Sequence, residues 1–305
     1  MDNITFKTSQ YHEKIQSIKV LPPWFRQKIP NHKKIAFLKK ILNDLKLHTV
    51  CQSALCPNLG QCWSMGVATF MILGQRCTRA CRFCAVKTGE PFDVDPCEPE
   101  HVAKAVKELQ LNYVVITSVT RDDLLDKGVG QFIDTIKCIR CSSPKTKIEV
   151  LIPDFDNQRD LLEKLICVSP DVIGHNIEMV KRLFDDMRPQ AKYHRSLSVL
   201  KCLREFHSDA LIKSGFMVGL GETKEEIVGL MQDLIESGCE LITIGQYLAP
   251  SASKRHVKEE RFVSPDEFEE YRELGLKMGF RNVFSGPLVR SSYLAEENYN
   301  QARNS

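Results

Sequence analysis

The sequence predicts an α/β fold in which short parallel strands alternate with helices and curl into a partial (β/α)6 barrel. Three observations favour this fold. Six short apolar segments recur with strand-like composition, helical periods fill the gaps between them, and helix-start signals stand where two of these helices begin. In a TIM-type barrel the chemistry lies at the carboxyl ends of the strands. We therefore look for functional residues just after each strand.

The elements follow one another in a simple order. The expected strands occupy residues 67–73, 113–117, 147–152, 171–177, 212–218 and 241–246. Apolar residues share one face in two of the intervening helices, namely Val102, Ala105, Val106 and Leu109 in one and Ile227, Leu230, Met231, Leu234 and Ile235 in the other. Thr223 and Glu226 form a capping box at the start of the second of these helices. Ser264 and Glu267 do the same for a final helix to about residue 278, in which Pro265 takes the first position.

The N-terminal part precedes this alternation. Residues 1–31 are expected to form an extended arm, because three prolines interrupt any helix there, and Trp24 and Phe25 can attach the arm to the body. A lysine-rich helix over 32–46 and an irregular segment over 49–65 follow. We divide the chain into an arm and first cysteine segment (1–66), a barrel (67–250) and a C-terminal extension (251–305).

Charge is unevenly distributed in an otherwise ordinary globular composition of 43% hydrophobic and 27% charged residues. Residues 1–50 hold ten Lys or Arg against Asp2, Glu13 and Asp44, which gives this part a charge of +7. The net charge of the whole chain is +3, so the remaining residues together carry −4. A basic segment of this kind docks an acidic partner or nucleic acid, or forms a solvated helix face. It lacks the interleaved aromatic residues that stack bases, and we expect no nucleic-acid partner.

The cysteine content indicates a reducing compartment. No apolar run approaches the ~18 to 20 residues of a membrane span, and no apolar segment follows the start as in a signal peptide. Twelve cysteines in such a chain bind metal or pack in the core. We expect a cytoplasmic protein without membrane contact. The expected structural thiols are Cys97, Cys167, Cys202 and Cys239, with Cys138 and Cys141 in or at the end of a helix.

Two cysteine triplets lie within 34 residues and differ in spacing. The first triplet reads CxxxxCxxxxxC and the second reads CxxxCxxC. Their members are Cys51, Cys56 and Cys62 in the first triplet and Cys77, Cys81 and Cys84 in the second. Each has one thiolate fewer than the four that normally hold a [4Fe–4S] cube, which leaves one iron free for another ligand. Structural zinc needs four ligands, usually in two CxxC-like pairs, and the second triplet has neither the pairs nor a nearby fourth ligand.

The second triplet resembles the signature of the radical S-adenosylmethionine enzymes, over residues 67 to about 250. The first triplet narrows the resemblance to the lipoyl synthase family, and the match runs from about residue 20 to the end. The segments that carry it are residues 56–63, 68–74, 117–123, 149–155, 175–178, 213–215, 217–223 and 286–293. Gly174 and Gln190 depart from the family, which tends to have Asn and Gly there. These departures concern local loop shape.

The resemblance implies an enzyme that removes hydrogen at C6 and C8 of a carrier-bound octanoyl chain and inserts one sulfur at each position. Two molecules of S-adenosylmethionine would be used per product. The second triplet would hold the cube that splits this cosubstrate. The first triplet would hold a second cube that supplies sulfur, closed by Ser292 with Ser291 as the fallback. The implied catalytic residues are Cys77, Cys81, Cys84 and Ser292.

Polar residues after two of the strands are the candidate cosubstrate contacts. They are Ser118, Thr120, Asp122, Asn176, Glu178 and Arg188. The first three belong to the segment where the superfamily holds the methionine moiety, and helix or turn capping is the alternative role for them. An arginine such as Arg188 can bind a carboxylate through two nitrogens. The segment 219–221 either approaches the nucleoside through its backbone or simply turns tightly before Thr223.

The resemblance also implies partners. These are an octanoylated lipoyl carrier domain or glycine-cleavage carrier protein, a reduced donor of the ferredoxin or flavodoxin type, and a cluster-delivery protein. Two other functions are alternatives. Radical methylthiolation of tRNA normally brings a small β-type RNA-binding domain, and no such segment follows residue 250. A non-catalytic iron–sulfur carrier or sensor would have fully ligated cubes and no need of polar strand ends.

Overall fold

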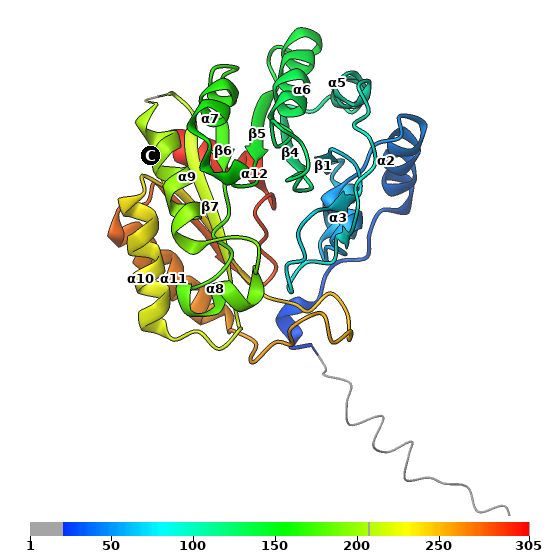
Figure 1. Ribbon diagram of the computed structural model, residues 1–305. Coiled ribbons are helices and arrows are strands. Elements are labelled where there is room, and N and C mark those ends of the chain that lie inside the picture. The colour runs from blue at the N-terminus through cyan, green and yellow to red at the C-terminus, as the bar shows by residue number, and fades with distance from the viewer. Residues whose placement is uncertain (1–20, 207, 305) are drawn as a thin grey trace, which may run out of the picture.

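Seven parallel strands form one curved sheet in the computed structural model, which describes residues 21–206 and 208–304. The strand order is β1-β4-β5-β6-β7-β8-β9. The bounds are β1 (Thr69–Ile72), β4 (Tyr113–Ser118), β5 (Lys147–Leu151), β6 (Val172–Gly174), β7 (Leu211–Val218), β8 (Leu241–Gln246) and β9 (Asn282–Gly286). A separate pair joins β2 (Arg76–Cys77) to β3 (Lys87–Thr88). Helices flank the curved sheet in Figure 1, and the predicted partial barrel is confirmed.

The strand β9 was not expected from the sequence. It adds a seventh member to the six predicted strands and pairs with β8, starting at Leu241↔Asn282. Val283 is its one buried residue, so the segment lacks the apolar run that marks the other strands. Its place in the sheet comes from the pairing with β8 and the covering helix α11 (Pro265–Met278).

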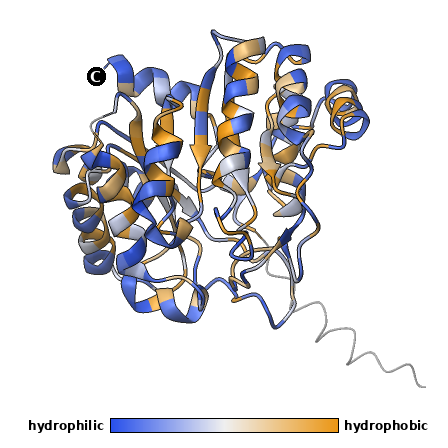
Figure 2. Ribbon diagram, turned by 45° about the horizontal axis from the view of Figure 1, so that its top comes forward, coloured by the Kyte–Doolittle hydropathy of each residue, from blue (hydrophilic) through white to orange (hydrophobic). Residues whose placement is uncertain are grey.

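Amphipathic helices cover the outer side of the sheet. Besides α11 they are α5 (Glu98–Glu108), α6 (Val129–Ser142), α7 (Arg159–Ile166), α8 (Lys181–Met187), α9 (Tyr193–Glu205) and α10 (Lys224–Glu236). Figure 2 shows hydrophobic and hydrophilic residues alternating around these helices, with largely hydrophobic strands between them. Both predicted capping boxes are present, at Thr223 with Glu226 and at Ser264 with Glu267. In each box the side chain of either residue accepts a hydrogen bond from the backbone N–H of the other, so two N–H groups at the helix start gain a partner.

The N-terminal region is more regular than expected. The lysine-rich helix is confirmed as α2 (His32–Asp44), and the short helix η1 (Pro23–Phe25) precedes it. The segment expected to be irregular contains α3 (Val50–Ser53) and α4 (Leu59–Ser64), because Thr49 caps α3 through the N–H of Gln52. That prediction was wrong. The predicted arm lies outside the described residues as far as residue 20.

One of the two expected aromatic attachments is present. The ring of Phe25 is buried and lies 5.6 Å from that of Phe262, whereas Trp24 is more than one-third exposed. Phe25 therefore attaches the start of the described chain to the segment between β8 and α11.

The C-terminal helix α12 (Ala295–Asn304) packs on the other side of the strands. Successive side chains of a strand point to opposite faces of the sheet, so β4, β6, β7 and β8 each contribute to two apolar clusters. The smaller cluster joins strand residues to α12 and consists of Tyr113, Val115, Val172, Leu211, Leu241, Ala295, Tyr299 and Ala302. The segment 287–294 therefore has to return from β9 across the inner side of the barrel before α12 begins.

The cysteines outside the two triplets are free thiols. Cys202 and Cys239 are buried as predicted. Cys97 and Cys167 are exposed, so the prediction that they pack in the core was wrong. Cys138 and Cys141 lie near the end of α6, where the sequence placed them. No helix in the described part of the chain is long and apolar enough to cross a bilayer.

Candidate functional site

The second triplet lies in the loop that follows β1, beside the carboxyl ends of the neighbouring strands. Backbone N–H groups of Arg79 and Thr120 both donate to Cys77 Sγ, each at 3.4 Å. Hydrogen bonds to cysteine sulfurs are a common feature of iron–sulfur sites. Burial raises the pKa of the Cys84 thiol to about 12, and the neighbouring Cys81 and Cys77 add to the rise. The three thiols are thus close enough to repel one another when ionised.

Three buried polar atoms near this loop lack a hydrogen-bond partner among the described residues. They are Ser118 Oγ, Asn176 Oδ1 and Arg188 Nε. Arg188 also donates through Nη1 to the carbonyl of Asn176 at 3.2 Å. Burial raises the pKa of the Cys81 thiol while Arg188 opposes the rise, so the guanidinium lies close to the second triplet. Buried polar groups without a partner are uncommon, and a ligand site is one explanation for them.

Glu178 occupies a strained backbone position beside these atoms. Its φ of 72° lies in the left-handed region, which costs a non-glycine residue about 1–3 kcal/mol. Two hydrogen bonds to β7 hold it there, from its N–H to the Gly215 carbonyl at 3.0 Å and from the Met217 N–H to its carbonyl at 2.8 Å. Burial raises the pKa of its carboxyl group, and Arg188 opposes the rise. Glu178 and Arg188 therefore face a common space.

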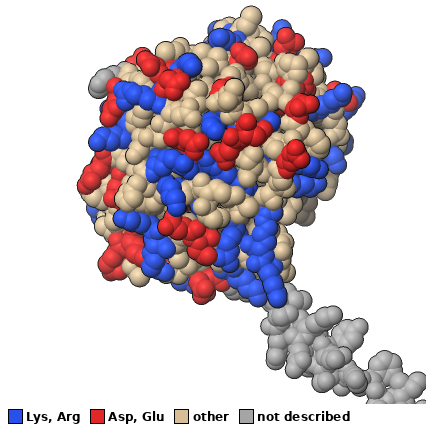
Figure 3. Space-filling model, in the orientation of Figure 1, with Lys and Arg blue, Asp and Glu red and all other residues tan. Residues whose placement is uncertain are grey.

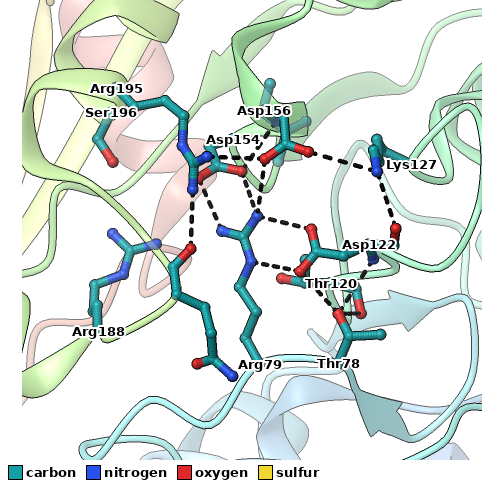
Figure 4. A network of polar contacts seen from close by, with 12 residues as sticks. Thr78, Arg79, Thr120, Asp122, Lys127, Asp154, Asp156, Arg188, Arg195 and Ser196 are labelled. Atoms are coloured by element: carbon teal, nitrogen blue, oxygen red, sulfur yellow. Dashed lines mark hydrogen bonds and ion pairs between the residues drawn. The ribbon is translucent and has the colours of Figure 1, made fainter.

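Thr120 and Asp122 have partners within the protein. The Thr120 carbonyl accepts from the N–H and Oγ1 of Thr78, at 3.1 and 3.0 Å. The Asp122 carboxylate accepts from Nε and Nη2 of Arg79, both at 2.8 Å (Figure 4). Arg79 also binds Asp154. Sequence reasoning missed both, although Arg79 lies within the second triplet and Asp154 lies in the segment 149–155 that carries the family resemblance.

The departure at Gln190 and the glycine turn have local explanations. Gln190 Oε1 accepts from the N–H of Ala80 at 3.0 Å, so it supports the second-triplet loop. Gly219 and Gly221 both have positive φ. A Cβ on Gly219 would lie 2.0 Å from Gln246 Nε2. The structure therefore supports the tight-turn alternative for this segment.

The first triplet lines a hollow between the N-terminal helices and the C-terminal segment. The walls include Cys51, Cys56 and Cys62 together with Thr69, Arg290, Ser292 and four further residues, and the empty volume is about 290 Å³. Burial raises the pKa of the Cys62 thiol to about 12, and Cys51 and Cys56 add to the rise. Three thiols from α3, α4 and the turn between them thus converge on one space.

The two adjacent serines of the C-terminal segment point to different places. Ser292 Oγ accepts from Thr69 Oγ1 at 2.7 Å at the wall of this hollow. Ser291 Oγ accepts from Asn176 Nδ2 at 2.6 Å and would lie 3.3 Å from a Cβ on Gly215. A Cβ on Gly215 would lie nearer still to Thr243 Oγ1, at 2.4 Å, so the glycine in β7 chiefly makes room for Thr243. Ser292, and not Ser291, shares the hollow with the first triplet.

The surroundings of the first triplet suit thiolate ligands. The indole N–H of Trp63 is buried and lacks a well-formed hydrogen bond to any described residue. Burial raises the pKa of the Cys51 thiol, while the Thr69 backbone and the Trp63 indole oppose the rise. Burial lowers the pKa of the Arg290 guanidinium, and Cys56 opposes that fall. Donors and one cation thus surround the three sulfurs.

These features fit a multinuclear cluster by their donor set. Between residues 21 and 304, apart from residue 207, no group of three or more His, Cys, Asp or Glu is placed to hold a metal ion. The thiols are thus not arranged around a single metal ion. The fit to a cube rests on the three thiols of each triplet, on N–H donors directed at sulfur, and on Ser292 as an oxygen donor for the first triplet.

Sequence comparisons give consistent matches along the chain. Residues 71–234 match the family model of the radical SAM superfamily. Residues 2–56 match the N-terminal domain of lipoyl synthase of the radical SAM family. The chain is 49% identical over 279 residues to the lipoyl synthase of Christiangramia forsetii, covering 92% of this chain and 94% of that protein. It is 50% identical over 276 residues to that of Caldicellulosiruptor saccharolyticus, covering 90% and 96%.

Structural comparisons support the fold. The FeFe-hydrogenase maturase HydG from Carboxydothermus hydrogenoformans superposes with a TM-score of 0.59 at 12% identity, covering 96% of this chain and 72% of that chain. Methylornithine synthase superposes with a TM-score of 0.54 at 12% identity, covering 68% and 61%. At such low identity these similarities concern the arrangement of strands and helices alone.

Proposed function

This chain belongs to the lipoyl synthase family of the radical S-adenosylmethionine superfamily, and from this premise we propose which of its residues carry out the family's reaction. It is a sulfurtransferase that inserts two sulfur atoms, at C6 and C8 of a protein-bound octanoyl-lysine. S-Adenosylmethionine and a [4Fe–4S] cube are its cofactors. We propose that it also binds a second cube, and that the arm, barrel and C-terminal extension meet at these two sites.

The second triplet is proposed to hold the cube that splits S-adenosylmethionine, with Cys77, Cys81 and Cys84 as thiolate ligands. We call it the first cube, and the cube that supplies sulfur is the second cube. When bound, the two cubes supply the electron that splits S-adenosylmethionine and the sulfur that is inserted. The free polar atoms beside this triplet belong to Ser118, Asn176 and Arg188 and are suited to bind the cosubstrate. Arg188 provides a fixed positive charge for a carboxylate.

Glu178 completes this proposed cosubstrate site. Its half-buried carboxyl group supplies an acceptor for hydroxyl or amino protons. Contacts from Thr120 and Asp122 stay predictions, because Asp122 and the Thr120 carbonyl already have partners in the protein.

The first triplet and Ser292 are proposed to hold the second cube. The observation that carries this assignment is the position of Ser292 Oγ at the wall of the hollow that the three thiols line. An alkoxide is a harder ligand than a thiolate and leaves more readily on protonation, which suits a cube that is consumed. Thr69 donates a hydrogen bond to this oxygen and would stabilise it in the ionised form. The same hydrogen bond orients Ser292 toward the hollow.

Two triple variants test these assignments. Replacing Cys77, Cys81 and Cys84 with Ala should abolish formation of 5′-deoxyadenosine and leave about four irons per chain, the content of one cube. Replacing Cys51, Cys56 and Cys62 should leave that formation intact and stop sulfur insertion into an octanoylated carrier peptide, followed by mass spectrometry. The control replaces Cys97, Cys138 and Cys141, which lie outside both triplets. Dithiolated product from the first-triplet variant would contradict the assignment of the sulfur donor.

The carrier protein is proposed to meet the exposed face of α2. Lys33, Lys34, Lys39 and Lys40 are exposed there beside Phe37, which is 59% exposed. An exposed aromatic ring within a basic face suits an acidic protein domain. Figure 3 shows Lys and Arg side chains interspersed with Asp and Glu over the visible face, and several basic side chains lie near the start of the described chain. A donor of the ferredoxin or flavodoxin type and a cluster-delivery protein complete the proposed partners.

Charge reversal tests the docking surface. Changing these four lysines to Glu should weaken carrier binding in a salt-dependent way and leave turnover of a short octanoyl-lysine peptide within about threefold. A control changes the exposed Lys164, Lys192 and Lys201, which lie at α7 and α9 on the far side of the barrel in Figure 1. Equal losses with carrier and peptide would mean that α2 has a structural role.

A further inference from the structure

A buried arginine stands inside the second triplet. Arg79 lies between Cys77 and Cys81, and its side chain is 4% exposed. Its Nε and Nη2 donate to Asp122 at 2.8 Å each, and its Nη1 and Nη2 donate to Asp154 at 2.9 and 2.7 Å. Two bidentate contacts fix both the position and the plane of a guanidinium.

The two carboxylates are themselves held in place. Asp154 follows β5 and its side chain is fully buried, while Asp122 follows β4. Arg195 of α9 lies against Asp154 and Asp156, with nitrogen–oxygen distances of 2.9 Å to each. Lys127 lies 3.5 Å from Asp156. Figure 4 shows Arg79 at the centre of these contacts, which we call the Arg79 network: Arg79, Asp122, Lys127, Asp154, Asp156 and Arg195.

Short links connect the Arg79 network to a cluster ligand. The backbone N–H of Arg79 donates to Cys77 Sγ, and so does the N–H of Thr120. Thr78 Oγ1 lies within hydrogen-bond distance of both the Thr120 carbonyl and the Asp122 carboxylate, at 3.0 and 3.1 Å. The loop that carries the thiols is therefore joined to the segments after β4 and β5 by the two residues that follow Cys77.

A second arginine in the same loop has a different environment. Arg82 lies between Cys81 and Cys84 and pairs with Asp186, and the side chains of the pair are 39% and 70% exposed. Both arginines bring a positive charge to the loop, but only Arg79 is removed from water. Burying a charged group is costly unless its partners compensate fully. An arginine that only supplied positive charge near the cluster could stay exposed, as Arg82 does. Burial with two carboxylate partners instead fixes the position of the Arg79 side chain.

We propose that Arg79 is a positioning residue, which fixes the second-triplet loop on the ends of β4 and β5. The thiols thereby keep a constant position relative to the free polar atoms of Ser118, Asn176 and Arg188. The proposal rests on the assignment of the second triplet as the site of the first cube. It gives Asp122 a role in holding Arg79 and requires no contact between Arg79 and the cosubstrate.

The test compares Arg79→Lys with Arg82→Lys in the reconstituted full-length protein. Both keep the positive charge and lose the planar fork of the guanidinium. Arg79→Lys should retain its iron, form 5′-deoxyadenosine about 100-fold more slowly, and show an altered change in the electron paramagnetic resonance spectrum of the reduced cube on addition of S-adenosylmethionine. Arg82→Lys should stay within about threefold of the unmodified protein and show its spectral change.

A second variant covers the case in which Arg79→Lys does not fold. Asp122 is one-third exposed. Asp122→Asn removes its negative charge and one of the two oxygens that accept from Arg79, at a less buried position, and should reproduce the altered spectrum. An unchanged rate and spectrum in either folded variant would overturn the proposal and leave the network a stabilising role alone. Failure of the cluster assignment gives a different result, because the variant without Cys77, Cys81 and Cys84 would then keep the spectrum that responds to S-adenosylmethionine.

Discussion

The two cysteine triplets are held by different kinds of contact. The second triplet is joined to β4, β5 and α9 through the buried ion pairs of the Arg79 network. The first triplet lies between two chain segments that are joined by neutral hydrogen bonds, from Thr69 to Ser292 and from Asn58 to the Leu288 carbonyl. A neutral hydrogen bond makes a net contribution of about 1 kcal/mol, whereas breaking a buried ion pair costs about 3–5 kcal/mol. The second-triplet site is therefore held by stronger contacts, and each contact that closes the first-triplet site is weaker.

This difference matches the proposed roles. A cube that splits the cosubstrate in every turnover needs ligands that return to the same position, and buried charges provide that position. A cube that is consumed and replaced needs a ligand that can leave. Changing one contact at a time in each site tests whether the two sites differ in this way.

The largest effect is expected from Asp154→Asn. Arg79 and Arg195 would lose their buried anion, and the free energy of unfolding should fall by about 3–5 kcal/mol. Urea unfolding at neutral pH measures this loss. The control is Asp160→Asn, which removes an exposed partner of Lys164 and should cost no more than about 0.5 kcal/mol. A loss below about 1 kcal/mol at Asp154 would mean that the network does not stabilise this side of the barrel.

An effect of pH on stability is expected from the buried His175. Burial lowers its pKa to about 4, and the charge of Arg188 contributes to the fall. Its Nδ1 lies 2.9 Å from the carbonyl of Ile152, and its Nε2 lies 3.0 Å from Ser196 Oγ, contacts that suit the neutral ring. Since the unfolded pKa is 6.5, the neutral ring contributes fully above pH 6.5 and its contribution is lost as the pH falls toward 4.

His175→Gln should remove this part of the pH dependence. Between pH 7.5 and 5.0 the stability of the unmodified protein should fall by about 2 kcal/mol more than that of the variant. Denaturant unfolding at the two pH values measures the difference. Parallel losses in the two proteins would show that His175 does not titrate with a lowered pKa.

The smallest effect on stability is expected at the first triplet. Thr69→Val keeps the shape of the side chain and removes the hydrogen bond to Ser292, at a cost of about 1 kcal/mol. The variant should lose the second cube to a chelator faster and form 5′-deoxyadenosine normally. The control is Thr117→Val, which removes a hydrogen bond of similar length to the Leu151 carbonyl, away from the hollow. Equal rates of cube loss in both variants would remove Thr69 from the proposed role.

The parts of the molecule that were predictable depend on local pattern. Helix starts at Thr223 and Ser264 were predicted because a capping box lies within four residues of sequence. The strand β9 and the helices α3 and α4 were missed, because β9 owes its place to pairing with β8 and α3 and α4 are too short to show a period. The position of Ser292 was accessible only through the family motif.

The Arg79 network illustrates what sequence could not provide. Arg79 and Asp154 lie 75 residues apart, and nothing local to either residue indicates the other. Asp122 lies after a strand, and its contact with the cosubstrate stays a prediction, because its partner in the protein depended on how two loops meet in space. Cys167 was placed wrongly for a similar reason, since an apolar neighbourhood in sequence does not decide which face of the fold a thiol occupies.

The contact between Thr69 and Ser292 joins positions 223 residues apart, and this separation has a consequence for biosynthesis. Domains fold largely in the order in which they leave the ribosome, and contacts between distant residues form late. The loop of the second triplet can settle once β4, β5 and α9 have emerged. The first triplet cannot gain its proposed fourth ligand until residue 292 has been made, well after α9, which ends at Glu205. The site whose cube is proposed to be consumed is thus completed later in synthesis than the site of the second triplet.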